Sequence, residues 1–195
     1  MFDKMTAAVG VQKSKKGKIT EELIMPDGVS ASVSGRVIML KGPKGETSRN
    51  ISAANIGVSV SGNKVLIESG SDSKRDKKLV GSMRAHIVNM VNGVTASHIY
   101  KMKVCFTHFP ITVTVAGSQL IVKNFLGEKT PRKVELPANA KVKVEGADIT
   151  IESSDKELAG KTAAAIEQKT RRANYDTRVF GDGIYITVKD SKEIK

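Results

Sequence analysis

Catalysis and metal binding depend on a few side-chain types, and this sequence places them poorly for either. Its histidines are His86, His98 and His108, and its single cysteine is Cys105. No two histidines have the spacing of a metal-binding pair on one helical face, and one thiol cannot complete a thiolate site. Cys105 and His108 are too close in sequence and too isolated to form a nucleophile–base pair. We therefore predict no catalytic centre and no metal site, and we expect the histidines to be structural.

A phosphate-binding loop is the next candidate. Gly160-Lys161-Thr162 resembles the end of such a loop, but the position that should hold its first glycine is Asp155. A carboxylate there would repel phosphate, and the segment is expected inside a helix instead of at a helix N-terminus. We therefore expect no cofactor and no small-molecule substrate.

Two cationic segments remain, over residues 123–133 and 169–178. Each contains four Lys or Arg residues and one acidic residue. Guanidinium groups, an amide, hydroxyls and an aromatic ring together suit contacts with phosphate groups. The alternatives are that the first segment is simply solvated and that the second only stabilises the end of a helix. From these segments we predict the RNA-binding residues Lys123, Phe125, Gly127, Lys129, Arg132, Lys133, Lys169, Arg171, Arg172, Asn174, Tyr175 and Arg178.

The composition indicates a folded protein with a polyanionic partner. The 195 residues carry a net charge of +12, with 39% hydrophobic and 27% charged residues. Nucleic acid is the default partner for such a charge, and an anionic membrane surface is the lesser alternative. No apolar run approaches the roughly 20 residues that a membrane span needs. Aromatic residues make up only 4% of the chain, which argues against recognition of single strands by base stacking and favours folded RNA.

The chain contains an internal repeat. Residues 30–40 resemble residues 112–122, and residues 60–69 resemble residues 144–153. Gly45-Glu46 recurs as Gly127-Glu128, and Leu79-Val80-Gly81 recurs as Leu158-Ala159-Gly160. Two copies of one unit indicate a duplicated scaffold. Of the eight aromatic residues, only Phe2 precedes Tyr100, and this asymmetry favours the second copy as the contact surface.

Each copy shows strands followed by a helix. Alternating apolar residues predict hairpins about Ser34-Gly35 and Gly62-Asn63, with matching turns at residues 116–118 and 146–148. Residues 41–45 contain Gly and Pro and are expected to form a loop. Residues 98–106 form a further strand candidate between the copies.

The helix ends are also marked. Asp72 or Ser73 can cap the first helix, and Asn92-Gly93 predicts its end. Residues 154–157 have capping-box spacing, in which Ser154 caps the second helix. Its predicted apolar face contains Leu158, Thr162, Ala165 and Ile166. Gly81 and Gly160 occupy equivalent helical positions, which predicts close approach of helix and sheet.

We therefore predict an α+β fold of two tandem homologous units, each a small antiparallel sheet packed against one helix. The expected domains are a basic N-terminal arm at residues 1–25, a first sheet-plus-helix repeat at residues 26–97, and a second at residues 98–195.

Four segments carry a resemblance to a known family. They are Met-Pro-Asp-Gly-Val at residues 25–29, Leu-Lys-Gly-Pro-Lys-Gly at residues 40–45, residues 89–95, and Arg-Val-Phe-Gly-Asp-Gly-Ile-Tyr at residues 178–185. With the duplication, they make essentially the whole chain similar to the L6 family of large-subunit ribosomal proteins, in its archaeal and eukaryotic form.

This resemblance implies a function. It implies a structural constituent of the cytoplasmic ribosome, not an enzyme, which binds large-subunit ribosomal RNA near the stalk base and the translation-factor-binding region. Its partners would be that RNA and neighbouring large-subunit ribosomal proteins. The family's main RNA-binding part is the second copy, and carried onto this chain it implicates Arg171, Arg172, Arg178, Gly181 and Gly183. At the glycines the backbone would approach phosphates closely.

Overall fold

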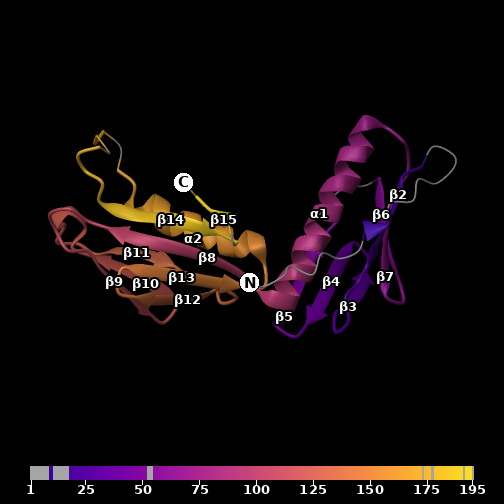
Figure 1. Cartoon of the computed structure of the whole chain (residues 1–195), viewed down its shortest axis with the longest axis horizontal. Coiled ribbons are helices and arrows are strands. Elements are labelled where there is room, and N and C mark those ends of the chain that lie inside the picture. Colours follow the sequence, from indigo (N-terminus) through magenta and orange to yellow (C-terminus); the bar gives the residue numbers. More distant parts are fainter. Residues whose placement is uncertain are drawn as a thin grey trace. The chain divides into compact units, whose positions relative to one another are not determined.

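The computed structural model describes residues 9–10, 18–51, 55–172, 174–176, 178–190 and 192–194. The chain divides into two compact units, Met1–Ser97 (unit 1) and His98–Lys195 (unit 2) (Figure 1). Each unit consists of antiparallel strands and one long helix, so the predicted α+β fold of two tandem units is confirmed. Each unit contains two sheets, however, where a single small sheet was expected.

Unit 1 contains a four-stranded sheet, a three-stranded sheet and a helix. The first sheet has the order β1 (Val9–Gly10), β2 (Thr20–Ile24), β7 (Lys64–Ser69) and β6 (Ile56–Ser61). The second has the order β3 (Ser30–Ser34), β4 (Val37–Gly42) and β5 (Gly45–Asn50), and the helix is α1 (Lys74–Ala96). Residues from both sheets and from α1 form one buried cluster, which includes Leu23, Ile38, Leu40, Ile67 and Ile87. In the second sheet β4 is the central strand, paired with β3 on one edge and with β5 on the other.

The predicted N-terminal arm, residues 1–25, includes a strand of the four-stranded sheet of unit 1. Residues 20–24 form β2, which pairs with β7 along its whole length, because Leu23 is buried in the core. The basic part of the arm falls mostly in residues 1–8 and 11–17, which lie outside the described residues.

Helix α1 begins as predicted but ends later. Ser73 is its N-cap, and its side chain accepts a hydrogen bond from the backbone N–H of Asp76. The predicted end at Asn92-Gly93 is wrong, because the helix continues to Ala96 and the left-handed residue is Ser97 (φ 51°). The extra turn buries Val94 completely. The backbone carbonyl of Val94 accepts a hydrogen bond from Lys44 N at 2.9 Å, so this turn is fixed by contact with the β4–β5 hairpin.

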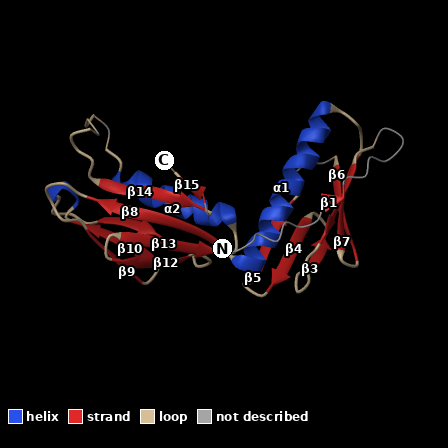
Figure 2. Cartoon of the chain, in the orientation of Figure 1, coloured by secondary structure: helices blue, strands red, loops and turns tan. Residues whose placement is uncertain are grey.

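Unit 2 repeats this plan with additions (Figure 2). Its larger sheet has the order β12 (Lys141–Glu145), β13 (Asp148–Ser153), β8 (His98–Cys105), β14 (Gly183–Lys189) and β15 (Lys192–Glu193). Its smaller sheet has the order β11 (Arg132–Glu135), β10 (Gln119–Lys123) and β9 (Thr112–Ala116). The 3₁₀ turn η1 (Phe125–Gly127) precedes β11, and helix α2 (Lys156–Thr170) precedes β14. A separate buried cluster, which includes Met102, Leu120, Ile149, Ile166 and Ile184, forms the core.

Helix α2 is capped one residue later than predicted. Its N-cap is Asp155, whose carboxylate accepts a hydrogen bond from Glu157 N at 2.9 Å, so the cap lies one residue after Ser154. Of the predicted apolar face, Thr162 and Ile166 are buried and Leu158 packs against the core. Ala165 is exposed, whereas Ala159 and Ala163 are also buried. The capping-box pattern therefore located the helix start to within one residue, and the predicted packing face is confirmed except at Ala165.

Two of the three histidines have structural partners. His98 Nδ1 lies 2.9 Å from Asp190 Oδ1 in the interior of unit 2, and His86 Nε2 lies 3.1 Å from an Arg49 guanidinium nitrogen. His108 is exposed. Within the described residues no helix is long and apolar enough to cross a membrane, and no three His, Cys, Asp or Glu side chains are grouped to hold a metal ion.

Candidate nucleic-acid interface

The two predicted cationic segments meet at one end of unit 2 through a shared acid. Residues 124–131 connect β10 to β11, and residues 171–182 connect α2 to β14. The carboxylate of Glu128 accepts hydrogen bonds from Arg132 Nε at 2.8 Å and Arg132 Nη2 at 2.7 Å. It also accepts one from Arg172 Nη2 at 2.8 Å. Segments that are far apart in the sequence are thus held together by one ion-pair network.

Arg132 fixes this network to the helix and to the core. Its Nη1 donates a hydrogen bond to the backbone carbonyl of Lys169 at 2.6 Å, in the last turn of α2. A cation at this position also interacts favourably with the negative end of the helix dipole. The guanidinium carbon lies 4.3 Å from the centroid of the Phe125 ring, which adds a cation–π contact. The Arg132 side chain is therefore held by three groups, the Glu128 carboxylate, the Lys169 carbonyl and the Phe125 ring.

The segment after α2 is ordered by a chain of ring contacts. The Arg172 guanidinium carbon lies 4.9 Å from the centroid of the Tyr175 ring. The Tyr175 and Phe180 rings pack edge to face, with centroids 5.3 Å apart and planes at 84°. The charge network on Glu128 thus continues into two aromatic side chains.

A third segment, which the sequence analysis did not include, joins the other two. Residues 106–111 connect β8 to β9. Thr107 N donates a hydrogen bond to Asp182 Oδ1 at 2.8 Å, and Asn124 Nδ2 donates one to the carbonyl of Pro110 at 3.1 Å. The Phe109 ring lies 3.7 Å from the position that a Cβ would take at Gly127. We call residues 106–111, 124–131 and 171–182 the loop cluster. The available sequence signal was the pair Phe106 and Phe109, two aromatic residues close together in an aromatic-poor chain.

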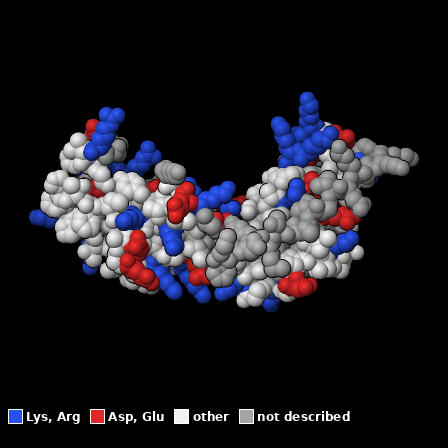
Figure 3. Space-filling view, viewed as in Figure 1, with Lys and Arg blue, Asp and Glu red and all other residues white. Residues whose placement is uncertain are grey.

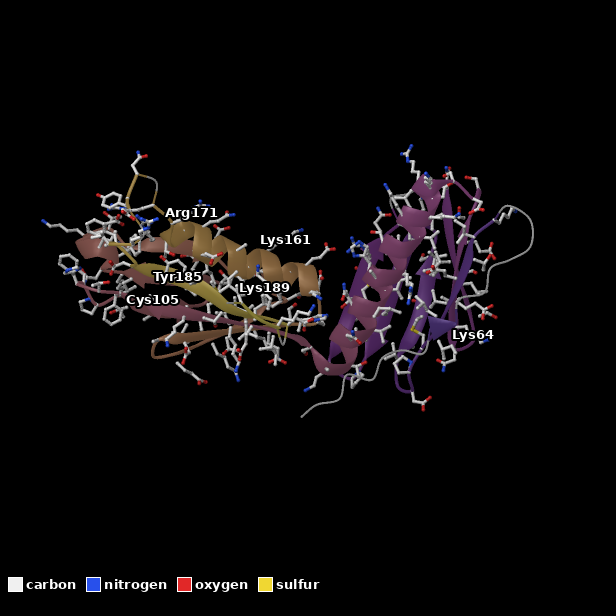
Figure 4. The ribbon with its side chains drawn as sticks, turned by 45° about the horizontal axis from the view of Figure 1, so that its top comes forward. Lys64, Cys105, Lys161, Arg171, Tyr185 and Lys189 are labelled. Carbon is white, nitrogen blue, oxygen red and sulfur yellow. The ribbon has the colours of Figure 1, made fainter. Side chains whose placement is uncertain are left out.

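The electrostatics separate positioning cations from available ones. A hydrogen bond from Arg132 holds the pKa of Glu128 below its ordinary value, the charges of Arg132 and Arg172 act in the same direction, and burial opposes them. Both arginines are therefore engaged within the protein. Cations in or beside the cluster that are exposed, with no ion pair among the described residues, are Lys123, Lys129, Lys133, Lys169, Arg171 and Arg178. Figure 3 shows Lys and Arg side chains projecting at this end of unit 2, and Figure 4 shows Arg171 where α2 ends.

Some predicted site residues have other roles. Phe125 is 1% exposed, so it supports the 124–131 loop and cannot touch a ligand. Gly183 is buried at the start of β14, where a Cβ would lie 3.1 Å from the Tyr185 ring, so its small size is required inside the unit. Gly181 is partly buried. Gly127 (φ 76°) and Asn174 (φ 67°) are exposed residues in left-handed conformations that turn their loops.

Two loops of the cluster are longer than the equivalent connections of unit 1. In unit 1, β4 and β5 are joined by a tight turn at Pro43-Lys44, with Gly42 paired to Gly45. In unit 2, the equivalent connection between β10 and β11 is expanded to residues 124–131. The helix of unit 1 leads directly into β8, whereas residues 171–182 follow α2. The cluster is therefore built where the second copy is longer than the first.

Comparison with known proteins identifies the family. Residues 25–97 and 109–183 match the family model described as Ribosomal protein L6. The chain belongs to the ribosomal protein L6 family. It is similar to the large ribosomal subunit protein uL6 of Methanobrevibacter smithii, with 41% identity over 172 residues that cover 88% of this chain and 97% of the relative. It is also 42% identical to uL6 of Methanothrix thermoacetophila, over 88% of this chain and 98% of the relative. With uL6 of Nanoarchaeum equitans the identity is 42%, over 90% of this chain and 96% of the relative.

Membership of the L6 family confirms the resemblance seen in the sequence. The two matched ranges fall one in each copy of the repeat. L6 proteins are structural components of the cytoplasmic ribosome and not enzymes, as the sequence analysis predicted. A role in the large ribosomal subunit accounts for the basic composition of this chain.

Proposed function

We propose that this L6 protein binds large-subunit ribosomal RNA through the loop cluster of unit 2, near the stalk base and the translation-factor-binding region. The observation that carries the proposal is the Glu128 network with Arg132 and Arg172. It holds two cationic segments in one arrangement and leaves six other cations exposed around them. Unit 2, residues 98–195, is then the main RNA-binding part, and unit 1 is available to neighbouring large-subunit proteins.

The chemistry of the cluster suits a folded polyanion. Lys and Arg neutralise phosphates and release condensed counterions, which supplies affinity without reading sequence. Because the loops are fixed by hydrogen bonds before binding, less conformational entropy is lost when RNA binds. The spacing of the exposed cations can then match one fold of the RNA backbone.

Charge-neutralising substitutions test the RNA contact. Arg171→Gln and Arg178→Gln each remove one exposed cation without disturbing the Glu128 network. We expect each to weaken binding to a large-subunit ribosomal RNA fragment and to reduce the slope of log affinity against log salt by about one. Lys141→Gln is the matched control, because Lys141 is exposed on β12 at the end of the sheet opposite the loops. Equal slopes for all three variants and the parent protein would contradict the proposal.

The location requires a separate measurement. Chemical probing of large subunits with and without this protein should show protection of nucleotides at the stalk base and the factor-binding region. Protection confined to other regions would refute the location while leaving RNA binding itself intact.

A further inference from the structure

Exposed aromatic rings are concentrated in the loop cluster. Phe106, Phe109, Tyr175 and Phe180 are 49%, 47%, 46% and 40% exposed. They are four of the eight aromatic residues of the chain. Each ring presents about half of its surface to solvent at the same end of unit 2, where the three loops meet. This arrangement is costly for stability, because burying a ring in the core would stabilise the fold.

The rings are held by local contacts. The Tyr175 ring contacts both the Arg172 guanidinium and the Phe180 ring. Phe109 packs beside Gly127, where any side chain would meet the ring. The residue after Phe106 donates its N–H to Asp182, whose side chain is buried. Ordered, half-exposed rings lose little conformational entropy when a flat ligand stacks on them.

We propose that the loop cluster binds unpaired nucleotides of the RNA, with bases stacked on Phe106, Phe109, Tyr175 or Phe180. The exposed cations would hold the phosphates on either side of each base. This inference rests on the proposed function, and it names the class of RNA: a loop or bulge, not a regular duplex. Unstacked bases offer the flat faces that aromatic side chains bind.

The inference also revises one expectation from the sequence. An aromatic content of 4% argued against base stacking when it was averaged over the chain. Stacking requires only a few rings in the right place, however, and here half of them lie at one end of one unit. The fold therefore concentrates a scarce residue type at the site where the cations are exposed.

The charges favour RNA over a protein partner. Aromatic residues and arginines also form the centres of protein–protein interfaces. Each acid of the cluster accepts a hydrogen bond within the protein, however: Glu128 from two arginines, Asp182 from the backbone N–H of Thr107, and Asp176 from the backbone N–H of Arg178. The cations Lys129, Arg171 and Arg178 remain exposed. A ligand that combines flat apolar faces with regularly spaced negative charge matches this surface, and unpaired RNA has both.

The test compares two hairpin RNAs that differ only in one bulged nucleotide, carrying the fluorescent base 2-aminopurine. We expect the full-length protein to bind the bulged hairpin more tightly and to quench its fluorescence. Phe106→Leu, Phe109→Leu, Tyr175→Leu and Phe180→Leu each keep an apolar side chain but remove the flat ring. Loss of a stacked base should weaken binding of the bulged hairpin on the order of tenfold and restore its fluorescence, with little effect on the uninterrupted hairpin. Phe109→Tyr should retain both properties.

Val179→Ala is the control, because Val179 is 60% exposed in the same segment but has no ring. It should leave both hairpins bound as before. The stacking inference is overturned if all four Leu variants bind the two hairpins as the parent does, or if the variants that lose binding lose both hairpins equally. It is also overturned if they instead lose association with another large-subunit protein. Failure of the proposed function is a different result: the parent protein would bind neither hairpin and no RNA fragment.

Discussion

At the scale of single residues, three glycines of this chain serve different purposes. A Cβ at Gly42 would lie 2.9 Å from the backbone oxygen of Val94, so glycine is needed for the β4–β5 hairpin to approach the end of α1. A Cβ at Gly160 would lie 3.4 Å from Tyr100 Oη, which is ordinary contact at the edge of crowding. A Cβ at Gly81 would meet nothing within 4 Å, and Gly81 is exposed. The prediction of close helix–sheet approach is therefore wrong for Gly81.

Alanine substitutions should distinguish these positions. Glycine inside a helix costs about 0.5–1 kcal/mol relative to alanine, and α1 at Gly81 has no reason for it within unit 1. We expect Gly81→Ala to raise the free energy of unfolding by about that amount, Gly160→Ala to raise it less, and Gly42→Ala to lower it. Urea unfolding followed by circular dichroism measures all three. A loss of stability in Gly81→Ala would show that this position is constrained by a contact absent here.

At the scale of elements, the end of the helix in each unit is hydrogen-bonded to an equivalent hairpin, β4–β5 in unit 1 and β10–β11 in unit 2. In unit 1, Lys44 N donates to the carbonyl of Val94 near the end of α1. In unit 2, Arg132 Nη1 donates to the carbonyl of Lys169 near the end of α2. The last carbonyls of a helix lack partners within it, so each unit satisfies one of them from the neighbouring hairpin. The donor is a backbone N–H in unit 1 and a guanidinium group in unit 2.

The Glu128 network should contribute stability that depends on pH. Because the pKa of Glu128 is lowered in the folded protein, its stabilising effect is fully present above the unfolded-state pKa of about 4.3. It is lost as the pH falls through the lower folded-state pKa. We expect Glu128→Gln to lower the free energy of unfolding at pH 7 by no more than about 1 kcal/mol, because the pair is partly exposed. The difference should shrink at pH 3.

Urea unfolding at both pH values measures this difference. Glu135→Gln is the matched control, since Glu135 is an exposed carboxylate on the same hairpin. If the Glu128→Gln variant is as stable as the parent protein at pH 7, or if the difference grows at pH 3, the network does not have the role we assign to it.

The sequence predicted the positions of most strands and helices, but it predicted less well how these elements pack. Period-two patterns and glycine turns located the hairpins, because strand alternation and positive φ angles are local properties. The end of α1 was misread, because Val94 is buried against strands that are distant in the sequence. Local signals do not report such contacts.

The candidate site shows the same division. The cationic segments were visible as composition, but their junction through Glu128 depends on a contact between residues 44 positions apart. From the sequence alone, Arg132 and Arg172 were predicted to bind phosphates and Phe125 to contact RNA, because this contact is not visible there. The 106–111 segment was missed because it contains no Lys or Arg. It is joined to the other loops through the backbone N–H of Thr107 and the carbonyl of Pro110, which no side-chain pattern marks.

At the scale of the whole molecule, each of the two units has its own hydrophobic core, and the two cores share no residue. The buried cluster of unit 1 contains residues from Leu23 to Val94, and that of unit 2 contains residues from Tyr100 to Ile184. Neither cluster takes a buried residue from the other unit. Domains with their own core can in principle fold alone, so the second copy could acquire longer loops and exposed rings without destabilising the first.

The fragment of residues 98–195 should therefore fold alone and retain the RNA-binding properties of the full chain. Its core, the Glu128 network and all three loops of the cluster lie within it. We expect cooperative thermal unfolding by circular dichroism, and the same preference for a bulged over an uninterrupted hairpin as in the full chain. The fragment of residues 1–97 should also fold but show no such preference, because the described part of it has no exposed aromatic ring. If the fragment of residues 98–195 folds but does not prefer the bulged hairpin, unit 1 contributes to the RNA contact. The duplication has then produced one shared surface instead of a division of roles.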